Sequence, residues 1–374
     1  MKSLDFLLKN QESGGRMIEN IKSKSVFLYD LSNEKVIYEK NPDLRLPFAS
    51  ITKVITAILA IEKSTDPQNT MIEMEEKVIN DVLPLQPSLS PLSLYPGRSF
   101  PIIDFIYATL VKSGCAAARQ LALYAGNGDL ETFLEKASEL LHRLGCNDTK
   151  IIDPTGIIDE GQYSTVRDIT RFFIYAMENP LFASVVSSFG YRSIYFPENL
   201  DTTNALVRPD SIFFNPYVIG GKTGTTDEAG RCIVCCFEGK GKKYVLAALG
   251  FPFINDEDNR YQFYAEDINS LIFSTFKEEG DFAKIELPIH IKRVHANDEF
   301  KLEPTISNVL LNQEIKYTFV SENESVASVD NSGHVKVHAP GFTQIEVISN
   351  TGDYDICYID SREEERRIRT PRVL

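Results

Sequence analysis

The spacing of hydrophobic and polar positions predicts that the first half of the chain is mainly helical. Residues 25–29 and 35–39 alternate on either side of a polar turn, which is typical of a β-hairpin. The run Val54–Ile61 is apolar on nearly every side and follows Pro47 closely, so it predicts a helix that is buried all round. Amphipathic runs with a helical period follow at 101–112, 116–126 and 129–144. We therefore expect region 64–165 to be mainly helical.

Turn and cap signals stand at the end of this region. The segment Asp153–Gly156 is predicted to be a turn, and Gly161–Ser164 leads into a further helix. We expect Ser164 or Thr165 to cap that helix, with Asp168 near its first turn.

Strand patterns dominate the second half. Apolar runs separated by short glycine-containing turns predict an antiparallel meander of strands at Tyr217–Thr226, Arg231–Glu238 and Lys243–Phe251. A helix from about Ala265 to Phe276 is expected to close the first domain. Short alternating runs recur beyond Phe282, and Asp330–Gly333 is a clear hairpin turn. This last part is predicted to be a separate all-β sandwich of about 75 residues.

These patterns divide the chain into a polar N-terminal segment, a first domain with a helical subdomain, a β-sandwich and a charged tail. The expected ranges are 1–24, 25–282 with the subdomain at about 64–165, 283–360 and 361–374.

Composition and charge exclude several classes of function. A hydrophobic content of 43% with 25% charged residues is ordinary for globular proteins. The net charge of −14 argues against binding to nucleic acid. No apolar stretch of the length that spans a membrane is present. Residues 1–24 lack the apolar core of a signal peptide, so we expect either that an export signal is missing from this chain or that the protein is cytoplasmic.

The motif Ser-x-x-Lys occurs three times, and one copy stands where chemistry is expected. Ser32 lies in the polar turn of the first hairpin, and Ser274 lies near the end of a predicted helix. Ser50 alone stands at the first turn of the buried helix, with Lys53 three residues on and on the same face. Burial disfavours a charged lysine, so the neutral amine can take the proton of the serine hydroxyl.

Two further stretches fit the Ser50 site. Ser113-Gly114-Cys115 stands between two predicted helices, where a serine also has a simple structural interpretation as the cap of the next helix. Gly220–Thr226 places a lysine and a threonine among glycines on a predicted strand. This pattern can hold a carboxylate, or it can be a glycine-rich strand end.

In this order, Ser-x-x-Lys, Ser-x-Cys and Lys-Thr-Gly resemble the three motifs of penicillin-binding proteins and serine β-lactamases. Over about residues 20–280 the chain is most similar to the low-molecular-mass D-alanyl-D-alanine carboxypeptidases, serine peptidases that trim peptidoglycan stems. The matching stretches are Pro47–Lys53, Gly161–Thr165, Thr203–Leu206, and Gly221–Thr226 followed by Ala229-Gly230. The resemblance implies an α+β fold of the β-lactamase/transpeptidase-like type, in which an antiparallel sheet with helices adjoins an all-helical subdomain.

The resemblance also implies a role for each catalytic residue. Ser50 is expected to attack the carbonyl of the penultimate D-alanine and to form an acyl-enzyme, with Lys53 as general base. Ser113 is expected to relay a proton to the leaving D-alanine. The backbone N–H groups of Ser50 and Thr225 are expected to form the oxyanion hole.

The implied substrate-binding residues are Cys115, Lys222, Thr223, Gly224 and Thr225. Lys222 is expected to add positive potential, and Thr223 to bind the terminal carboxylate. Cys115 is a departure, because the middle motif of the family usually ends in asparagine. A thiol is a weak donor and acceptor, so we expect that it does not reproduce the amide's hydrogen bonds to the lysine and the substrate. Altered substrate handling or loss of activity would follow.

Histidine and cysteine usage argues against two other chemistries. His142 is the only histidine of the first domain and fits a surface helix, so a Ser-His-Asp triad is not expected. Cys232 and Cys235 form a C-x-x-C, but residues three apart on a strand point to opposite faces. We interpret them as buried thiols that act as small hydrophobic residues. No metal and no organic cofactor is expected.

The C-terminal part has a resemblance of its own. Residues 288–359 resemble a bacterial Ig-like domain of group 2, mainly in Ser321–Asp330 and Ser332–Val335. Such a domain is usually a spacer or an adhesive module. The charges of Ser361–Leu374 are not segregated onto one face, so no amphipathic membrane anchor is expected in this chain.

The sequence therefore predicts a serine D-alanyl-D-alanine carboxypeptidase, with transpeptidation as a second activity. Its expected partners are stem peptides ending in D-Ala-D-Ala, β-lactams as covalent inhibitors, and no nucleic acid. Its expected location is extracytoplasmic, at the cell wall or the outer face of the membrane. One alternative is a non-catalytic penicillin-binding or wall-binding protein. Another is a β-lactamase, which needs a second base; Asp159 and Glu160 lie in the relevant segment, but we interpret it as a structural loop.

Overall fold

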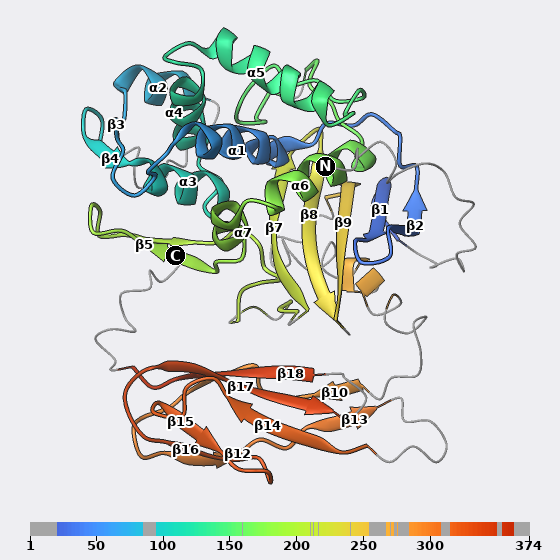
Figure 1. The fold of residues 1–374 in the computed structure, drawn as a ribbon, viewed down its shortest axis with the longest axis vertical. Coiled ribbons are helices and arrows are strands. Elements are labelled where there is room, and N and C mark those ends of the chain that lie inside the picture. Colours follow the sequence, from blue (N-terminus) through green and yellow to red (C-terminus); the bar gives the residue numbers. More distant parts are fainter. Residues whose placement is uncertain are drawn as a thin grey trace. The chain divides into compact units, whose positions relative to one another are not determined.

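The computed structural model divides the chain into two compact units, which are described separately below (Figure 1). One unit comprises 1–207, 218–238 and 242–268, and the other comprises 208–217, 239–241 and 269–374. The residues that the structure describes are 21–84, 95–158, 160–209, 211, 213–215, 217–239, 241–253, 267–269, 271–272, 275, 284–307, 315–349 and 354–362.

A five-stranded sheet forms the base of the first unit, with strand order β2-β1-β9-β8-β7 (Figure 1). Its strands are β1 Ser25–Asp30, β2 Lys35–Lys40, β7 Val218–Thr226, β8 Gly230–Gly239 and β9 Lys242–Phe251. The N-terminal hairpin is confirmed, and Ser32 lies in its turn. Strand β1 also pairs antiparallel with β9, so the start of the chain closes onto the end of the predicted meander. The predicted meander of β7, β8 and β9 is confirmed as three adjacent strands.

Helices cover this sheet and form a separate helical region. They are α1 Lys53–Lys63, α2 Glu76–Val82, α3 Ile102–Leu110, α4 Cys115–Ala125, α5 Leu130–Arg143, α6 Val166–Met177 and α7 Pro180–Val186. Helix α6 packs on β1 and β9, and α7 packs on β7. The three amphipathic runs at 101–144 are confirmed as α3, α4 and α5. The Thr165 side chain caps α6 by accepting a bond from the N–H of Asp168, as predicted.

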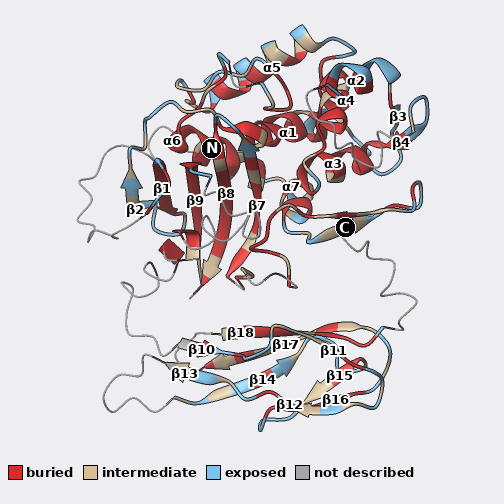
Figure 2. Cartoon of the chain, turned by 180° about the vertical axis from the view of Figure 1, so that it is seen from behind, coloured by how far each residue is buried: buried red, intermediate tan, exposed pale blue. Residues whose placement is uncertain are grey.

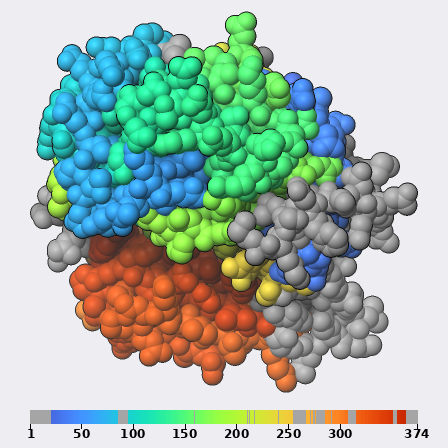
Figure 3. Space-filling view, turned by 45° about the horizontal axis from the view of Figure 1, so that its top comes forward, coloured from blue at the N-terminus to red at the C-terminus, as the bar shows by residue number. Residues whose placement is uncertain are grey.

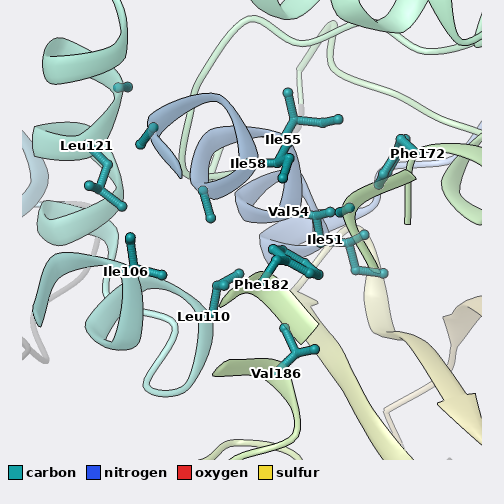
Figure 4. Close-up of a cluster of buried hydrophobic side chains, with 14 of the residues drawn as sticks. Ile51, Val54, Ile55, Ile58, Ile106, Leu110, Leu121, Phe172, Phe182 and Val186 are labelled. Atoms are coloured by element: carbon teal, nitrogen blue, oxygen red, sulfur yellow. The ribbon is translucent and has the colours of Figure 1, made fainter. Parts of the chain in front are cut away.

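Helix α1 lies at the centre of the first unit, because α3, α4, α5, α6 and α7 all pack against it. Figure 4 shows Val54, Ile55 and Ile58 pointing outward from α1 in different directions, with apolar side chains of neighbouring helices around them. Each such side chain, when fully buried, contributes about 1.5–3 kcal/mol to folding. In Figure 2, α1 and most of the sheet are coloured as buried. The start of α1 is thus held by packing against several helices.

The turn before α1 differs from the prediction. We expected Ser50 in the first turn of an α-helix, but Ala49–Thr52 forms a 3₁₀ helix, η2, that precedes α1. Ala49 has a φ of 46°, which non-glycine residues rarely adopt. The apolar pattern predicted the helix correctly and could not report this local backbone conformation.

Short elements in the first unit were not predicted. Strands β3 Met71–Glu73 and β4 Ser99–Pro101 pair with each other, as do β5 Gly190–Arg192 and β6 Asn199–Asp201. Strands of three residues are too short to show an alternating pattern.

Figure 3 shows that the blue and green parts of the chain, which are distant in sequence, lie side by side on one face of the molecule.

From Lys284 onward, the described residues of the second unit form strands, turns and loops, as predicted for an all-β sandwich. Its strands are β10 Lys284–Glu286, β11 Ile291–Arg293, β12 Glu299–Lys301, β13 Thr305–Ser307, β14 Tyr317–Ser321, β15 Ala327–Val329, β16 His334–Val337, β17 Phe342–Ser349 and β18 Tyr354–Asp360. They form sheets with the orders β11-β18-β17-β14, β12-β16-β15 and β10-β13. Residues along β17 alternate between buried and half-buried, and Asp330–Gly333 is the turn between β15 and β16.

Several predictions fall partly or wholly outside the described residues. These are the N-terminal segment up to residue 20, Asp159, Ser274 and the tail from residue 363. Of the predicted helix at 265–276, the residues described (267–269, 271–272 and 275) are helical. Within the described part of the chain, no helix has the length and apolar character needed to cross a membrane.

Candidate active site

Ser50 and Lys53 form a direct hydrogen-bonded pair. Ser50 lies in η2, and Lys53 is the first residue of α1. The Lys53 Nζ lies 2.7 Å from the Ser50 Oγ. The lysine side chain is fully buried, although it carries an ionisable group. A nucleophile in direct contact with a buried amine is the arrangement that lysine-activated catalysis requires.

The Lys53 amine has two further partners. It donates to the backbone carbonyl of Thr155 at 2.6 Å and to the Cys115 Sγ at 3.4 Å. Cys115 is the first residue of α4 and is buried. The thiol at this position therefore keeps a contact with the lysine. The sulfur lies within hydrogen-bond distance of the amine, although as a weaker acceptor than an amide oxygen.

Ser113 and Lys222 form a second serine–lysine pair. The Ser113 Oγ accepts a hydrogen bond of 2.9 Å from the Lys222 Nζ. Ser113 has a φ of 61° and precedes α4, whose N-cap residue is Gly114, with no side-chain cap bond. The interpretation of Ser113 as the cap of α4 is therefore wrong. Its hydroxyl is turned toward β7 instead.

Lys222 is buried in β7, and its environment disfavours the charged form. Its Nζ also donates to the backbone carbonyl of Thr223 at 2.7 Å. Burial, aided by the neighbouring Lys53 amine, holds the pKa of Lys222 well below its usual value, while Cys115 acts in the opposite direction.

Strand β7 runs directly beside the Ser50 turn. A Cβ added at Gly224 would lie 2.9 Å from the Phe48 carbonyl oxygen and 3.1 Å from the Ser50 nitrogen. Only a residue without a side chain permits this approach. The adjacent Thr225 is exposed, and Thr223 is half-buried. The predicted set Cys115, Lys222, Thr223, Gly224 and Thr225 is thus gathered around Ser50 by contacts or by neighbouring positions on one strand.

Sequence reasoning missed Thr203 as a member of this site. The hydroxyls of Thr203 and Thr223 lie 2.7 Å apart, and either oxygen can be the donor. Thr203 stands in the stretch Thr203–Leu206, which matches the family pattern, and this was the signal available in the sequence. The stretch carries no charge and no periodicity that marks a binding role.

The structure also places the other residues that the sequence singled out as candidates. His142 is exposed on α5, as predicted. Glu160, one candidate for a second base, is exposed. All six cysteines are buried thiols, and burial raises the pKa of Cys236 to about 12. Within the described ranges, no group of three His, Cys, Asp or Glu side chains is arranged to hold a metal ion.

A buried serine–lysine pair beside a Ser-x-Cys turn and a Lys-Thr-Gly strand is typical of serine peptidases that use a lysine base. Comparison with known proteins agrees with this class. Residues 10–252 match the D-alanyl-D-alanine carboxypeptidase family, and the chain belongs to that family. Residues 309–357 match the bacterial Ig-like domain of group 2, which confirms the resemblance of the second unit.

Individual relatives are moderately similar. The D-alanyl-D-alanine carboxypeptidase DacF of Bacillus subtilis is 30% identical over 228 residues, which are 61% of this chain and 57% of that protein. The match thus spans less than two thirds of that relative. The D-alanyl-D-alanine carboxypeptidase of Streptomyces sp. strain K15 is 28% identical over 232 residues, covering 58% of this chain and 77% of that protein.

Solved structures show the same fold. The Streptomyces K15 DD-transpeptidase has a TM-score of 0.61 at 23% identity, over 70% of this chain and 100% of that chain. A D-alanyl-D-alanine carboxypeptidase from Mycobacterium tuberculosis has a TM-score of 0.60 at 22% identity, over 72% of this chain and 96% of that chain. The expected β-lactamase/transpeptidase-like fold is confirmed by these neighbours.

Proposed function

We propose that this protein is a serine D-alanyl-D-alanine carboxypeptidase that acts on peptidoglycan stem peptides through an acyl-enzyme at Ser50. The observation that carries the proposal is the 2.7 Å contact between the Ser50 hydroxyl and the buried Lys53 amine, opposite the Ser113–Lys222 pair. The family acts on D-Ala-D-Ala peptidoglycan substrates and binds β-lactams, so the chemistry of the site and the membership of the chain agree.

In the acylation step, the Ser50 Oγ bonds to the carbonyl carbon of the penultimate D-alanine while its proton passes to the Lys53 Nζ. The carbonyl electrons move onto oxygen, which accepts hydrogen bonds from the backbone N–H groups of Ser50 and Thr225. The carbonyl then re-forms and the bond to the leaving nitrogen breaks. That nitrogen takes a proton through the Ser113 hydroxyl, and free D-alanine leaves.

The terminal carboxylate of the substrate is bound on β7. Thr223 donates its hydroxyl to the carboxylate, and the contact with Thr203 helps to fix the direction of that hydroxyl. Lys222 adds positive charge beneath the same stretch. The position of a carboxylate relative to Ser50 selects the last peptide bond of the stem.

The acyl-enzyme is released by water in the carboxypeptidase reaction, or by an amine of a second stem peptide in transpeptidation. We propose hydrolysis as the main outcome and transfer as the second. The structural neighbour named DD-transpeptidase supports keeping both. The alternative of a non-catalytic penicillin-binding protein rested on Cys115, and the contact of its sulfur with Lys53 argues for a working base.

This reaction places the protein where peptidoglycan is. Extracytoplasmic action is expected for the family, and we propose that this chain works at the cell wall or the outer face of the membrane. The Ig-like domain acts there as a spacer or an adhesive module.

The test is the intact mass of the protein after exposure to a penicillin, beside a Ser50→Ala variant with an unchanged circular dichroism spectrum. We expect a single stable adduct that is absent from the variant, and release of D-alanine from a peptide ending in D-Ala-D-Ala. Rapid loss of the adduct with consumption of the drug would indicate a β-lactamase. Absence of any adduct on folded protein would refute the acyl-enzyme and favour a binding protein.

A further inference from the structure

The turn Asp153–Gly156 contacts the catalytic lysine, although the sequence identified it only as a turn. The Thr155 carbonyl oxygen lies 2.6 Å from the Lys53 Nζ, and the two residues are separated by 102 positions in the chain. This contact is as short as the contact between Lys53 and Ser50. The turn is therefore part of the surroundings of the base.

The number of hydrogens on the Lys53 amine determines what the Thr155 contact does to the direction of its lone pair. A neutral amine has two N–H donors and one lone pair, whereas the ammonium has three donors and no lone pair. The Thr155 carbonyl and the Cys115 sulfur can each accept one N–H. With both N–H groups occupied, the lone pair is directed at the third partner, the Ser50 hydroxyl. A carbonyl in this position orients the base as well as solvating it.

The Asp153 carboxylate shapes the turn that presents this carbonyl. Its Oδ2 accepts the N–H of Thr155 at 2.9 Å, the N–H of Gly156 at 2.8 Å and the Thr155 hydroxyl. Asp153 is only 4% exposed, so its charge is stabilised by these donors from its own turn. Gly156 has a φ of 71°, and a Cβ there would lie 2.0 Å from the Ala49 carbonyl oxygen. The turn is thus packed directly against the Ser50 segment.

Gln162 ties the turn to the segment that carries Ser50 and Lys53. Its Oε1 accepts the N–H groups of Ile152 and Asp153 at 2.9 and 3.0 Å. Its Nε2 donates to the Thr52 Oγ1 at 3.2 Å, and that hydroxyl donates to the Ala49 carbonyl at 2.8 Å. Gln162 is buried, so these bonds are protected from water.

A second threonine completes the connection. The Thr56 hydroxyl, one turn along α1 from Thr52, donates to the Pro154 carbonyl at 2.7 Å. The turn is therefore connected to the segment that carries Ser50 and Lys53 at two points, directly at Thr56 and through Gln162 at Thr52. Neither attachment involves a group that reacts.

We propose that Asp153 and Gln162 are positioning residues that hold the Thr155 carbonyl so that the lone pair of Lys53 points at the Ser50 hydroxyl. The proposal rests on the proposed function, because it requires Lys53 to act as the base. It assigns the residues no contact with the substrate. They should affect the rate of acylation at saturating penicillin, and not the concentration at which acylation is half-saturated.

The experiment measures these two quantities for a penicillin with the full chain and its Asp153→Asn and Gln162→Met variants. Asparagine keeps the shape of aspartate but replaces the charged acceptor of the turn with a neutral, weaker one, and methionine keeps the length of glutamine without its hydrogen bonds. We expect the saturated acylation rate to fall by about 10- to 100-fold, the range in which loss of positioning affects a reaction. The half-saturating concentration should stay within about twofold, since Lys222 and Thr223 are unchanged.

The matched control is Asp168→Asn on α6. Asp168 is also a buried carboxylate, and it accepts bonds from the N–H of Asp148, the Thr149 hydroxyl and the Arg171 guanidinium. These partners belong neither to the turn nor to the contacts of the Lys53 amine. We expect Asp168→Asn to lower the melting temperature about as much as the two turn variants do. The saturated acylation rate and the half-saturating concentration of the folded protein should keep their parent values.

The outcomes separate the two proposals. Acylation of the parent chain at Ser50, with a wild-type rate in both turn variants, would overturn the positioning role and leave the proposed function intact. An equal loss of rate in Asp168→Asn would also overturn it, because the effect would then follow stability. Failure of the parent chain to react would refute the proposed function, and the positioning role with it.

Discussion

At the scale of single residues, two buried lysines in one site occupy different environments. Lys53 contacts a hydroxyl, a carbonyl and a thiol, whereas Lys222 contacts the Ser113 hydroxyl and a carbonyl. Burial and the neighbouring Lys53 amine lower the pKa of Lys222. A lysine with a lowered pKa is protonated over a narrower range of pH, so it attracts a carboxylate over a narrower range as well.

This lowered pKa predicts that binding of a carboxylate-bearing penicillin weakens as the pH rises. The protonated Lys222 attracts the carboxylate, and this charge is lost as the pH passes through the lowered pKa, below the ordinary value of 10.5. We expect the half-saturating concentration for acylation to rise with pH in that range. The control is the methyl ester of the same penicillin, which lacks the carboxylate and should show no such rise. The same rise for both compounds would contradict the assignment of Lys222.

Lys222 should also affect the stability of the protein, and this effect should increase with pH whereas penicillin binding weakens with pH. Unfolded Lys222 binds its proton up to the ordinary lysine range, while the folded form releases it at lower pH. The unfolded state therefore binds more protons between the two values. It follows that the contribution of Lys222 to the free energy of unfolding increases with pH across that interval.

At the scale of elements, the site depends on strand β7 and turn η2 lying in direct contact. Their separation is set at Gly224, where an added Cβ would meet the Phe48 carbonyl, the Ala49 Cβ and the Ser50 nitrogen at 2.9 to 3.1 Å. The groups on both sides are mainly backbone, which cannot move aside as a flexible side chain can. The spacing of the two elements is therefore fixed by the absence of one side chain.

We predict that Gly224→Ala separates β7 from the Ser50 turn. The substitution should slow acylation by at least about tenfold, because the N–H groups of Ser50 and Thr225 no longer face one oxygen. It should also destabilise the protein by about 1–3 kcal/mol through overpacking. Stopped-flow acylation and thermal unfolding measure the two effects.

A matched glycine is available as the control. Gly190 lies in strand β5, and an added Cβ there would be 3.5 Å from the Leu200 carbonyl oxygen and 3.7 Å from the Asp201 carboxylate. These are ordinary van der Waals distances. Gly190→Ala should therefore acylate at the parent rate, and a Gly224→Ala variant that also does so would show that β7 tolerates the displacement.

At the scale of the whole molecule, the two units have separate hydrophobic cores. The first core surrounds α1, and Ile58 is 1% exposed within it. The second core lies between the strands of the Ig-like unit, and Ile345 is fully buried there. Every residue of the proposed catalytic set belongs to the first unit. A unit with its own core can unfold as its own cooperative transition.

We predict that calorimetry resolves two transitions that respond to different substitutions. Ile58→Ala should lower one transition and Ile345→Ala the other, each by about 2–5 kcal/mol of unfolding free energy. Covalent reaction with a penicillin should shift only the transition that Ile58→Ala lowers. A single transition that moves with both substitutions would contradict the independence of the two cores.

The sequence determined much of this protein, because period and local chemistry act over a few residues. The alternating hairpin, the apolar run of α1, the amphipathic helices and the meander were all readable, as was Thr165 as a cap. The Ser50, Ser113 and Lys222 motifs marked the site before any geometry was known. The Ig-like unit was recognisable from its strand and turn spacing and from the stretch around Ser321–Asp330.

Only the tertiary structure decided which groups meet. The Lys53–Thr155 and Lys222–Ser113 contacts join residues 102 and 109 positions apart, and no local pattern encodes such a pairing. The structure shows that Ser113 is a partner of Lys222 and not the cap of α4, and that the hydroxyls of Thr203 and Thr223 are in contact. It also connected Asp153 and Gln162, whose side chains look like ordinary turn residues, to the segment that carries Ser50 and Lys53. The physical reason is that secondary structure follows from neighbours in the chain, whereas the direction of a lone pair follows from the packing of segments that are neighbours only after folding.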